Sequence, residues 1–246
     1  MKRYILLLVG AALLISGCSN DSASVTLSAA ASTRDAMEEI VEIFNASYPD
    51  IEVDMNFGGS GALKMQIEQG APVDIFLSAN INHYQDLVDG GYIDEGITYL
   101  ENELVLITPA DEENITSIKD LDESDRIALG TPESVPAGEY SATALIYYGL
   151  WETLESRIVY AEDVRQVLQY VEVGEVDAGI VYQSDALSSS NINIVETFDA
   201  ASHDAIEYPL GLLKSAADKK AVVTFYEFLQ TDVTLEVFNK YGFTTR

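Results

Sequence analysis

The sequence predicts an α/β protein with mainly parallel sheets. Apolar segments of strand length alternate with segments whose apolar residues recur three or four positions apart, as on one face of a helix. Glycine or serine stands at several strand-to-helix turns, which is typical of an open sheet that binds a ligand at the carboxyl ends of its strands. The chain has 246 residues, 48% of them hydrophobic, so it can form one large domain or two smaller lobes with their own cores.

The bounds of these elements follow from the residues between them. Glycine, proline and short polar clusters end the apolar segments. The predicted strands are 25–31, 51–57, 73–77, 103–108, 126–130, 158–160, 178–182, 192–195 and 208–213. The predicted helices are 33–48, 62–69, 82–88, 140–150 with an extension through Trp151 and Leu154 to Ser156, 161–172, 217–229 and 231–241.

Two of the early strand-to-helix turns contain a serine. Ser32 follows the first strand and is predicted to cap the next helix, with Asp35 three residues later. Ser60 lies in the glycine-rich turn 58–61, where the glycines allow the backbone to approach another group closely. For either serine in isolation, an ordinary helix cap explains the pattern equally well.

The turn at 131–143 is the third of this kind. Pro132 and Pro136 disfavour helix before them, and Ala137 and Gly138 then open a helical segment. Uncovered N–H groups at such a helix start bind anions, helped by the positive end of the helix dipole. The alternative is an ordinary connection in an α/β domain.

The N-terminus has the pattern of an exported lipoprotein. Basic residues are followed by an apolar segment, 4–15, that is too short to span a membrane comfortably. Residues 14–18 resemble the bacterial lipobox and end at Cys18, the single cysteine, so no intramolecular disulfide can form. This resemblance implies a signal peptide over 1–17, a lipid on Cys18, a polar tether over 18–24, and a location outside the cytoplasmic membrane, in the periplasm or at the cell surface. An ordinary signal peptide is the alternative.

The charge of the chain excludes several classes of partner. The formal net charge is −28, and removal of residues 1–17 takes away Lys2 and Arg3 but no acid, which leaves −30. Such a chain repels nucleic acids and anionic lipid headgroups. It also repels anionic ligands at long range, so an anion site here must depend on short-range donors.

Catalytic and metal-binding patterns are scarce. Neither His83 nor His203 has a partner at metal-ligand spacing, and both are expected at the solvated surface. The chain has no nucleophile elbow with a credible histidine partner and no Walker phosphate loop. Binding without chemistry, and without a cofactor, is therefore favoured. The alternative is a secreted hydrolase, which would need a base next to Ser32 or Ser60.

Seven short segments stand in the order seen in molybdate-binding proteins of ABC transporters. They are 29–32, 57–60, 70–76, 132–138, 161–165, 179–182 and 241–243. The match runs from about Val25 to the C-terminus. The chain therefore resembles the bacterial molybdate-binding lipoproteins of this family.

The resemblance implies a two-lobed periplasmic-binding-protein fold of type II that closes on one oxyanion in the cleft between its lobes. The implied lobes are 25–103 plus 211–246, and 104–210, with hinges near Leu104 and Leu210. It also implies a monomer that delivers molybdate or tungstate to a membrane permease, with molybdenum present only as the bound oxyanion. Sulfate or phosphate is the alternative ligand.

The resemblance further implies the ligand donors. They are Ser32, Ser60, Ala137, Val164 and Tyr182. The serines would supply hydroxyl and backbone N–H groups, Ala137 and Val164 backbone N–H groups only, and Tyr182 its phenolic O–H. Arg165, next to Val164, is expected to form a surface or inter-lobe ion pair, or to support the site from outside.

Overall fold

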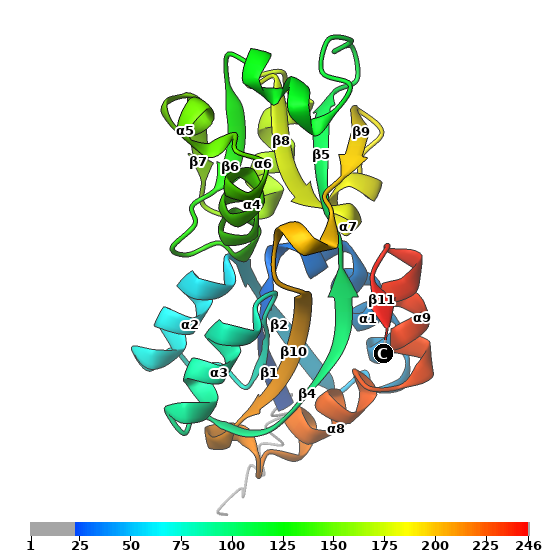
Figure 1. Ribbon diagram of the computed structural model, residues 1–246. Helices are drawn as coiled ribbons and strands as arrows, with labels where there is room; N and C mark the ends of the chain where they lie inside the picture. Colours follow the sequence, from blue (N-terminus) through cyan, green and yellow to red (C-terminus); the bar gives the residue numbers. More distant parts are fainter. Residues whose placement is uncertain (1–22, 246) are drawn as a thin grey trace, which may run out of the picture.

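Two β-sheets divide the chain into two lobes (Figure 1). The computed structural model describes residues 23–245. The first lobe has a six-stranded sheet of order β11-β4-β10-β3-β1-β2. Its strands are β1 (Ala23–Ala30), β2 (Ile51–Gly58), β3 (Ile75–Leu77), β4 (Ile93–Asn102), β10 (Ile206–Leu213) and β11 (Thr244–Thr245).

The second lobe has a five-stranded sheet of order β7-β6-β8-β5-β9. Its strands are β5 (Leu104–Pro109), β6 (Ile127–Gly130), β7 (Ile158–Ala161), β8 (Ala178–Tyr182) and β9 (Ile192–Thr197). The α-helices of the described chain are α1 (Arg34–Ser47), α2 (Ser60–Glu68), α3 (Ile81–Asp89), α4 (Pro136–Tyr147), α5 (Trp151–Leu154), α6 (Val164–Glu172), α7 (Gln183–Leu187), α8 (Lys220–Phe228) and α9 (Asp232–Lys240).

Both sheets are mixed, so the prediction of mainly parallel sheets was wrong. Three strands run parallel in each lobe: β2, β1 and β3 in the first, and β7, β6 and β8 in the second. By contrast, β10 pairs antiparallel with β3 and β4, and β5 with β8 and β9. These antiparallel strands flank the places where the chain passes from one lobe to the other, and a strand that arrives from the opposite lobe enters its sheet in the reverse direction.

The chain crosses between the lobes twice. Glu103 is the single residue between β4 and β5, which lie end to end (Figure 1). The return crossing joins Thr197, at the end of β9, to Ile206, at the start of β10. The predicted lobe boundary at residue 210 was therefore wrong, because residues 206–210 pair with β4 in the six-stranded sheet. Glu207 interrupts the apolar pattern there, which hid the beginning of the strand.

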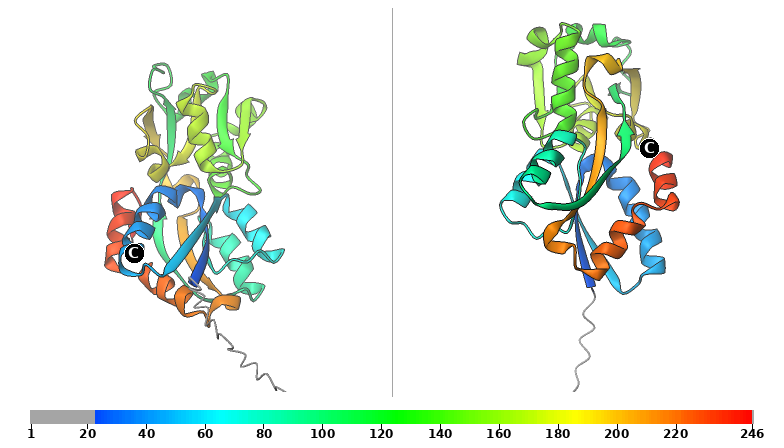
Figure 2. Two further views of the ribbon diagram at one scale, coloured as in Figure 1. Left: turned by 180° about the vertical axis from the view of Figure 1, so that it is seen from behind. Right: turned by 60° about the horizontal axis from the view of Figure 1, so that its bottom comes forward.

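Helices cover both faces of each sheet. In the first lobe, α1, α8 and α9 pack on one face, and α2 and α3 pack on the other over a smaller apolar cluster (Figures 1 and 2). In the second lobe, α4 and α6 lie on opposite faces (Figure 2). The apolar stripes predicted from helical spacing form these contacts: Met37, Ile40 and Phe44 of α1 are fully buried.

Two strands, β4 and β11, were not predicted. Their backbone pairing with neighbouring strands stabilises them, whereas their residue composition does not indicate a strand. β4 contains the polar run 94–96, and its first six residues are at least partly exposed, yet it pairs along its length with β10. β11 has only two residues, paired with β4. Among residues 23–245, no helix is both long and apolar enough to span a membrane.

Candidate ligand-binding site

A small cavity lies between the two lobes, where strands end and helices begin. Its lining includes all five predicted ligand donors, namely Ser32, Ser60, Ala137, Val164 and Tyr182. No residue that lines it is charged, and its volume is about 10 Å3. The structure brings the five residues together, and their contact with a ligand stays a prediction.

Three of these residues stand at the starts of helices. Ser60 and Val164 are the first residues of α2 and α6, and Ala137 is the second residue of α4, directly after Pro136. Proline is favoured at this first helical position because it lacks the N–H that would be unpaired there. N–H groups in a first helical turn have no acceptor within the helix, and the helix dipole adds positive potential. Such helix starts attract an anion without any cationic side chain.

The prediction that Ser32 caps a helix was wrong. Ser32 lies in the 3-10 turn Ala31–Thr33, and α1 begins at Arg34 without a side-chain cap hydrogen bond. The Ser32 hydroxyl instead lies 2.9 Å from the Tyr208 hydroxyl, inside the protein. It is therefore occupied with a partner from β10 and not with its own helix.

The five predicted donors are almost completely enclosed. Ser32 is 6% exposed and Val164 4%, whereas Ser60 and Ala137 have no exposed surface. Tyr182 closes one side of the cavity from the end of β8 and is 1% exposed. A ligand can therefore reach these groups only when the lobes move apart.

The Ser60 and Tyr182 hydroxyls can both donate into the cavity. The Ser60 Oγ accepts a hydrogen bond from the backbone N–H of Ala79 at 2.9 Å, so its own proton remains available. The Tyr182 hydroxyl is buried and has no hydrogen-bond partner among the described residues. Burial raises the pKa of Tyr182 well above its usual value, so the phenol keeps its proton at physiological pH.

The lobes touch directly beside the cavity, and glycines allow this. The Gly61 N–H donates to the carbonyl oxygen of Ser134, in the second lobe, at 3.0 Å. A Cβ on Gly59 would lie 2.6 Å from the same oxygen and 3.2 Å from the Glu162 carbonyl oxygen. Glycines around Ser60 therefore let the backbones of the two lobes meet over the cavity.

The family model described as bacterial extracellular solute-binding protein matches residues 25–244. The chain belongs to this family.

Relatives with known names and structures agree with this assignment. A candidate ABC transporter substrate-binding lipoprotein of Bacillus subtilis (YvgL) is 45% identical over 256 residues, which cover 99% of this chain and 98% of that protein. The molybdate-binding protein ModA of Escherichia coli is 36% identical over 257 residues, which cover 100% and 99%. The structure of a periplasmic molybdate-binding protein of Azotobacter vinelandii aligns with a TM-score of 0.80 at 23% identity, over 89% of this chain and 98% of that one. The predicted fold class and family resemblance are confirmed.

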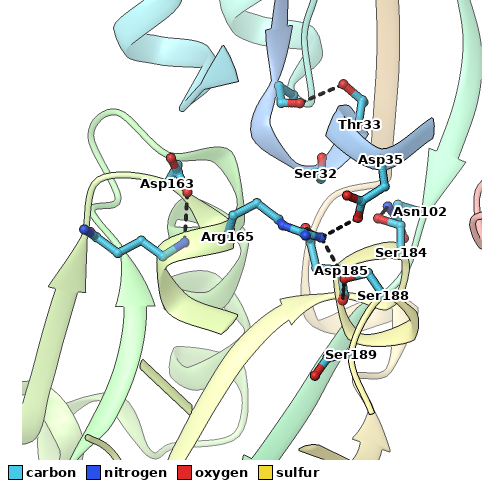
Figure 3. Close-up of polar contacts among 12 residues, drawn as sticks. Ser32, Thr33, Asp35, Asn102, Asp163, Arg165, Ser184, Asp185, Ser188 and Ser189 are labelled. Atoms are coloured by element: carbon cyan, nitrogen blue, oxygen red, sulfur yellow. Dashed lines mark hydrogen bonds and ion pairs between the residues drawn. The ribbon is translucent and has the colours of Figure 1, made fainter. Parts of the chain in front are cut away.

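Outside the cavity, an ion pair joins the lobes of the solute-binding protein. The Arg165 guanidinium, on α6, lies 3.0 Å from the carboxylate of Asp35 on α1 and donates to the Ser188 hydroxyl at 2.7 Å (Figure 3). It also lies 3.7 Å from Asp185. Of the alternatives predicted for Arg165, the inter-lobe ion pair is confirmed, and the guanidinium does not line the cavity.

The carboxyl group of Asp185, next to this ion pair, has an unusual environment. It has no exposed surface, and neither of its oxygens has a hydrogen-bond partner among the described residues. Burial raises its pKa to about 7, opposed by the charge of Arg165 and reinforced by those of Asp163 and Asp35. The carboxyl therefore changes its charge near neutral pH.

The histidines differ from the prediction of solvated positions. His83 is half-buried, and its Nε2 has no hydrogen-bond partner among the described residues. Burial lowers the pKa of His83, so the ring is neutral at physiological pH. His203 is also half-buried, with its ring 5.9 Å from that of Tyr140. The described residues contain no cluster of three or more potential metal ligands.

Sequence reasoning missed Tyr208 and Asn102, whose side chains lie behind Ser32. In the sequence, Tyr208 is indistinguishable from the other apolar residues of a buried strand. Asn102 ends a strand that was not predicted. The contact between Tyr208 and Ser32 joins residues 176 positions apart. No local pattern in the sequence reveals such a contact.

We predict that Asp185→Asn flattens the dependence of stability on pH. The folded-state pKa of about 7 exceeds the ordinary value of about 3.9, so the folded protein holds this proton more tightly than the unfolded chain. The resulting stability is fully present below about pH 4 and is lost as the pH rises through 7. A difference of one pKa unit corresponds to about 1.4 kcal/mol. Between pH 4 and pH 7, the free energy of unfolding of the wild type should therefore fall by a few kcal/mol relative to that of the variant.

Urea unfolding at several values between pH 4 and pH 8 measures this difference. Asp218→Asn, at an exposed aspartate, is the matched control and should follow the wild type. Parallel curves for the wild type and Asp185→Asn would contradict the prediction.

Proposed function

We propose that this solute-binding protein captures molybdate outside the cytoplasmic membrane and delivers it to an ABC permease. The observation on which this rests is the enclosed, uncharged cavity lined by Ser32, Ser60, Ala137, Val164 and Tyr182. The name of the ModA relative supports the choice of ligand, because that protein is 36% identical over the full length of this chain.

Neutral donors suffice for a doubly charged oxyanion. Its four oxygens accept many hydrogen bonds, and a bond to a charged acceptor stabilises by roughly 1.5–3 kcal/mol. Several such bonds offset the dehydration of the anion, while helix starts at Ser60, Ala137 and Val164 add positive potential. Tungstate has the same shape and charge, so we propose it as a second ligand.

Alternative functions receive less support from the site. A hydrolase needs a base beside its nucleophile, but the hydroxyl of Ser32 is paired with Tyr208 and that of Ser60 with the N–H of Ala79. Neither serine has a histidine or carboxylate as hydrogen-bond partner among the described residues. Sulfate and phosphate remain the competing ligands, and titration separates them.

We further propose that the mature protein is a monomer anchored by a lipid on Cys18. This residue and the signal peptide, 1–17, lie outside the described residues, so the sequence pattern and the lipoprotein name of the Bacillus subtilis relative support this step. An anchor of more than one acyl chain would keep the protein near its permease.

We predict tight one-to-one binding of molybdate and tungstate, and none of sulfate, in isothermal titration of the mature chain. Ser60→Ala should weaken molybdate binding roughly 10- to 100-fold, because one hydrogen bond to a charged acceptor is lost. Ser124→Ala is the matched control, since it removes a buried hydroxyl in the second lobe that has no partner among the described residues.

Two outcomes would count against molybdate. Binding of sulfate or phosphate with equal affinity would make the protein a general oxyanion carrier. If folded protein freed of ligand gives no binding heat with any of these anions, the cavity does not bind oxyanions.

We predict that Gly59→Ala impairs closure of the lobes. The added methyl group would lie 2.6 Å from the Ser134 carbonyl oxygen, so the lobes must stay slightly apart. Molybdate binding should weaken about tenfold, and small-angle scattering of the ligand complex should give a larger radius of gyration than for the wild type. Gly58→Ala is the neighbouring control, because its methyl group would meet only the Leu63 side chain, at 3.5 Å. Equal affinity and equal scattering for both variants would rule out closure at this contact.

A further inference from the structure

Behind the cavity, a chain of hydrogen bonds ends at the Ser32 hydroxyl. The Asn102 Nδ2 lies 3.3 Å from the Tyr208 hydroxyl, which lies 2.9 Å from the Ser32 Oγ. The same Asn102 amide nitrogen donates to the Ser184 hydroxyl at 2.8 Å. All four side chains are buried, and Asn102 and Ser184 lie close to Ser32 (Figure 3).

The direction of these hydrogen bonds can be assigned. The Asn102 Oδ1 accepts from the backbone N–H of Glu103 at 2.9 Å, which leaves Nδ2, a donor only, facing Tyr208. The Tyr208 oxygen therefore accepts from Asn102. Its own proton has one acceptor among the described residues, the Ser32 Oγ, and a buried hydroxyl that lost this bond would be left unpaired.

Tyr208 is also held in its protonated form. Burial raises the pKa of its phenol well above the usual value, so the O–H persists throughout the physiological range. With Tyr208 donating to the Ser32 Oγ, the proton of Ser32 is free to point away from Tyr208, into the cavity that Ser32 lines. Ser60 shows the same arrangement, because the Ala79 N–H donates to its Oγ.

We propose that Tyr208 is a positioning residue that fixes the Ser32 hydroxyl as a hydrogen-bond donor toward the bound oxyanion, and that this contributes to a preference of the site for anions that carry no proton. This inference rests on the proposed function and adds the basis of its selectivity. A protonated anion needs an acceptor in the cavity. With one lone pair of the Ser32 Oγ occupied by the Tyr208 proton, Ser32 could accept from such an anion only through its second lone pair, and its own proton would then have to turn away from the anion.

The position of the chain of hydrogen bonds links this effect to lobe closure. Asn102 ends β4 and Tyr208 lies in β10, the two strands of the first lobe that connect to the second. Ser184 belongs to α7 of the second lobe. The donor that orients Tyr208 is therefore shared with a residue of the opposite lobe.

The test is a double-mutant cycle in the mature chain, with molybdate binding measured by isothermal titration. The variants are Tyr208→Phe, Ser32→Ala and their combination. Tyr208→Phe should weaken molybdate binding about tenfold in the wild-type background. In the Ser32→Ala background it should have no further effect, because Tyr208 acts through the Ser32 hydroxyl. Tyr226→Phe is the control and should bind as the wild type does. It also removes a buried tyrosine hydroxyl, but one that has no hydrogen-bond partner among the described residues.

A second measurement distinguishes orientation from simple loss of packing. Competition by inorganic phosphate is followed from pH 5 to pH 9, a range over which its singly protonated fraction changes. The preference for molybdate over protonated phosphate should fall severalfold in Tyr208→Phe, because the Ser32 hydroxyl is then free to turn its own proton away from the anion and to accept a hydrogen bond from it. Tyr226→Phe should keep the wild-type profile.

The outcomes separate the two proposals. Equal losses from Tyr208→Phe with and without Ser32, or an unchanged phosphate profile, would overturn the positioning role even if molybdate binds tightly. If the wild type binds sulfate or phosphate in place of molybdate, the proposed ligand is wrong, and the same cycle with that anion decides the role of Tyr208. Absence of binding of every anion would overturn both proposals.

Discussion

The proposed site faces one electrostatic constraint, because an anion would have to be held inside a chain with a formal net charge of −28. No cationic side chain lines the cavity, so the attraction has to come from backbone N–H groups, hydroxyl groups and helix dipoles. These donors act only at short range and only when water is excluded. The placement of strand ends and helix starts from both lobes around one small volume follows from this requirement.

Charged groups are used elsewhere, at the rim where the lobes meet. Arg165 bridges from α6 to Asp35 on α1, close to the buried Asp185. The site itself stays neutral, whereas the contacts outside it are ionic. An arginine in the cavity would bind many anions, and a neutral set of donors at fixed positions is better suited to selecting one charge state and one shape.

The sequence was sufficient for much of the fold because the relevant signals are local. Apolar periodicity and turn residues located all nine predicted strands within two residues of their structural bounds. The helix predicted from residue 140 is α4, which begins four residues earlier, at Pro136. Long-range pairing was not visible: β4 is polar at its start and depends on β10, and the return crossing falls earlier than the apolar pattern suggested. The five predicted donors, which line one cavity, came from family motifs, since Ala137 and Val164 would contribute only backbone N–H groups. Tyr208 and Asn102 escaped because their roles depend on contacts across the fold.

The position of β1 in the first lobe has a mechanical consequence. Ala23 begins β1, a strand inside the six-stranded sheet of the first lobe, and both ends of the described chain belong to that sheet. Ala23 stands five positions after Cys18, and a chain segment of that length spans at most about 18 Å. If Cys18 carries the proposed lipid, the first lobe would be held near the membrane, and closure of the lobes would move the second lobe relative to it. Ligand binding would then change the position of the second lobe relative to the membrane, while the first lobe stays in place.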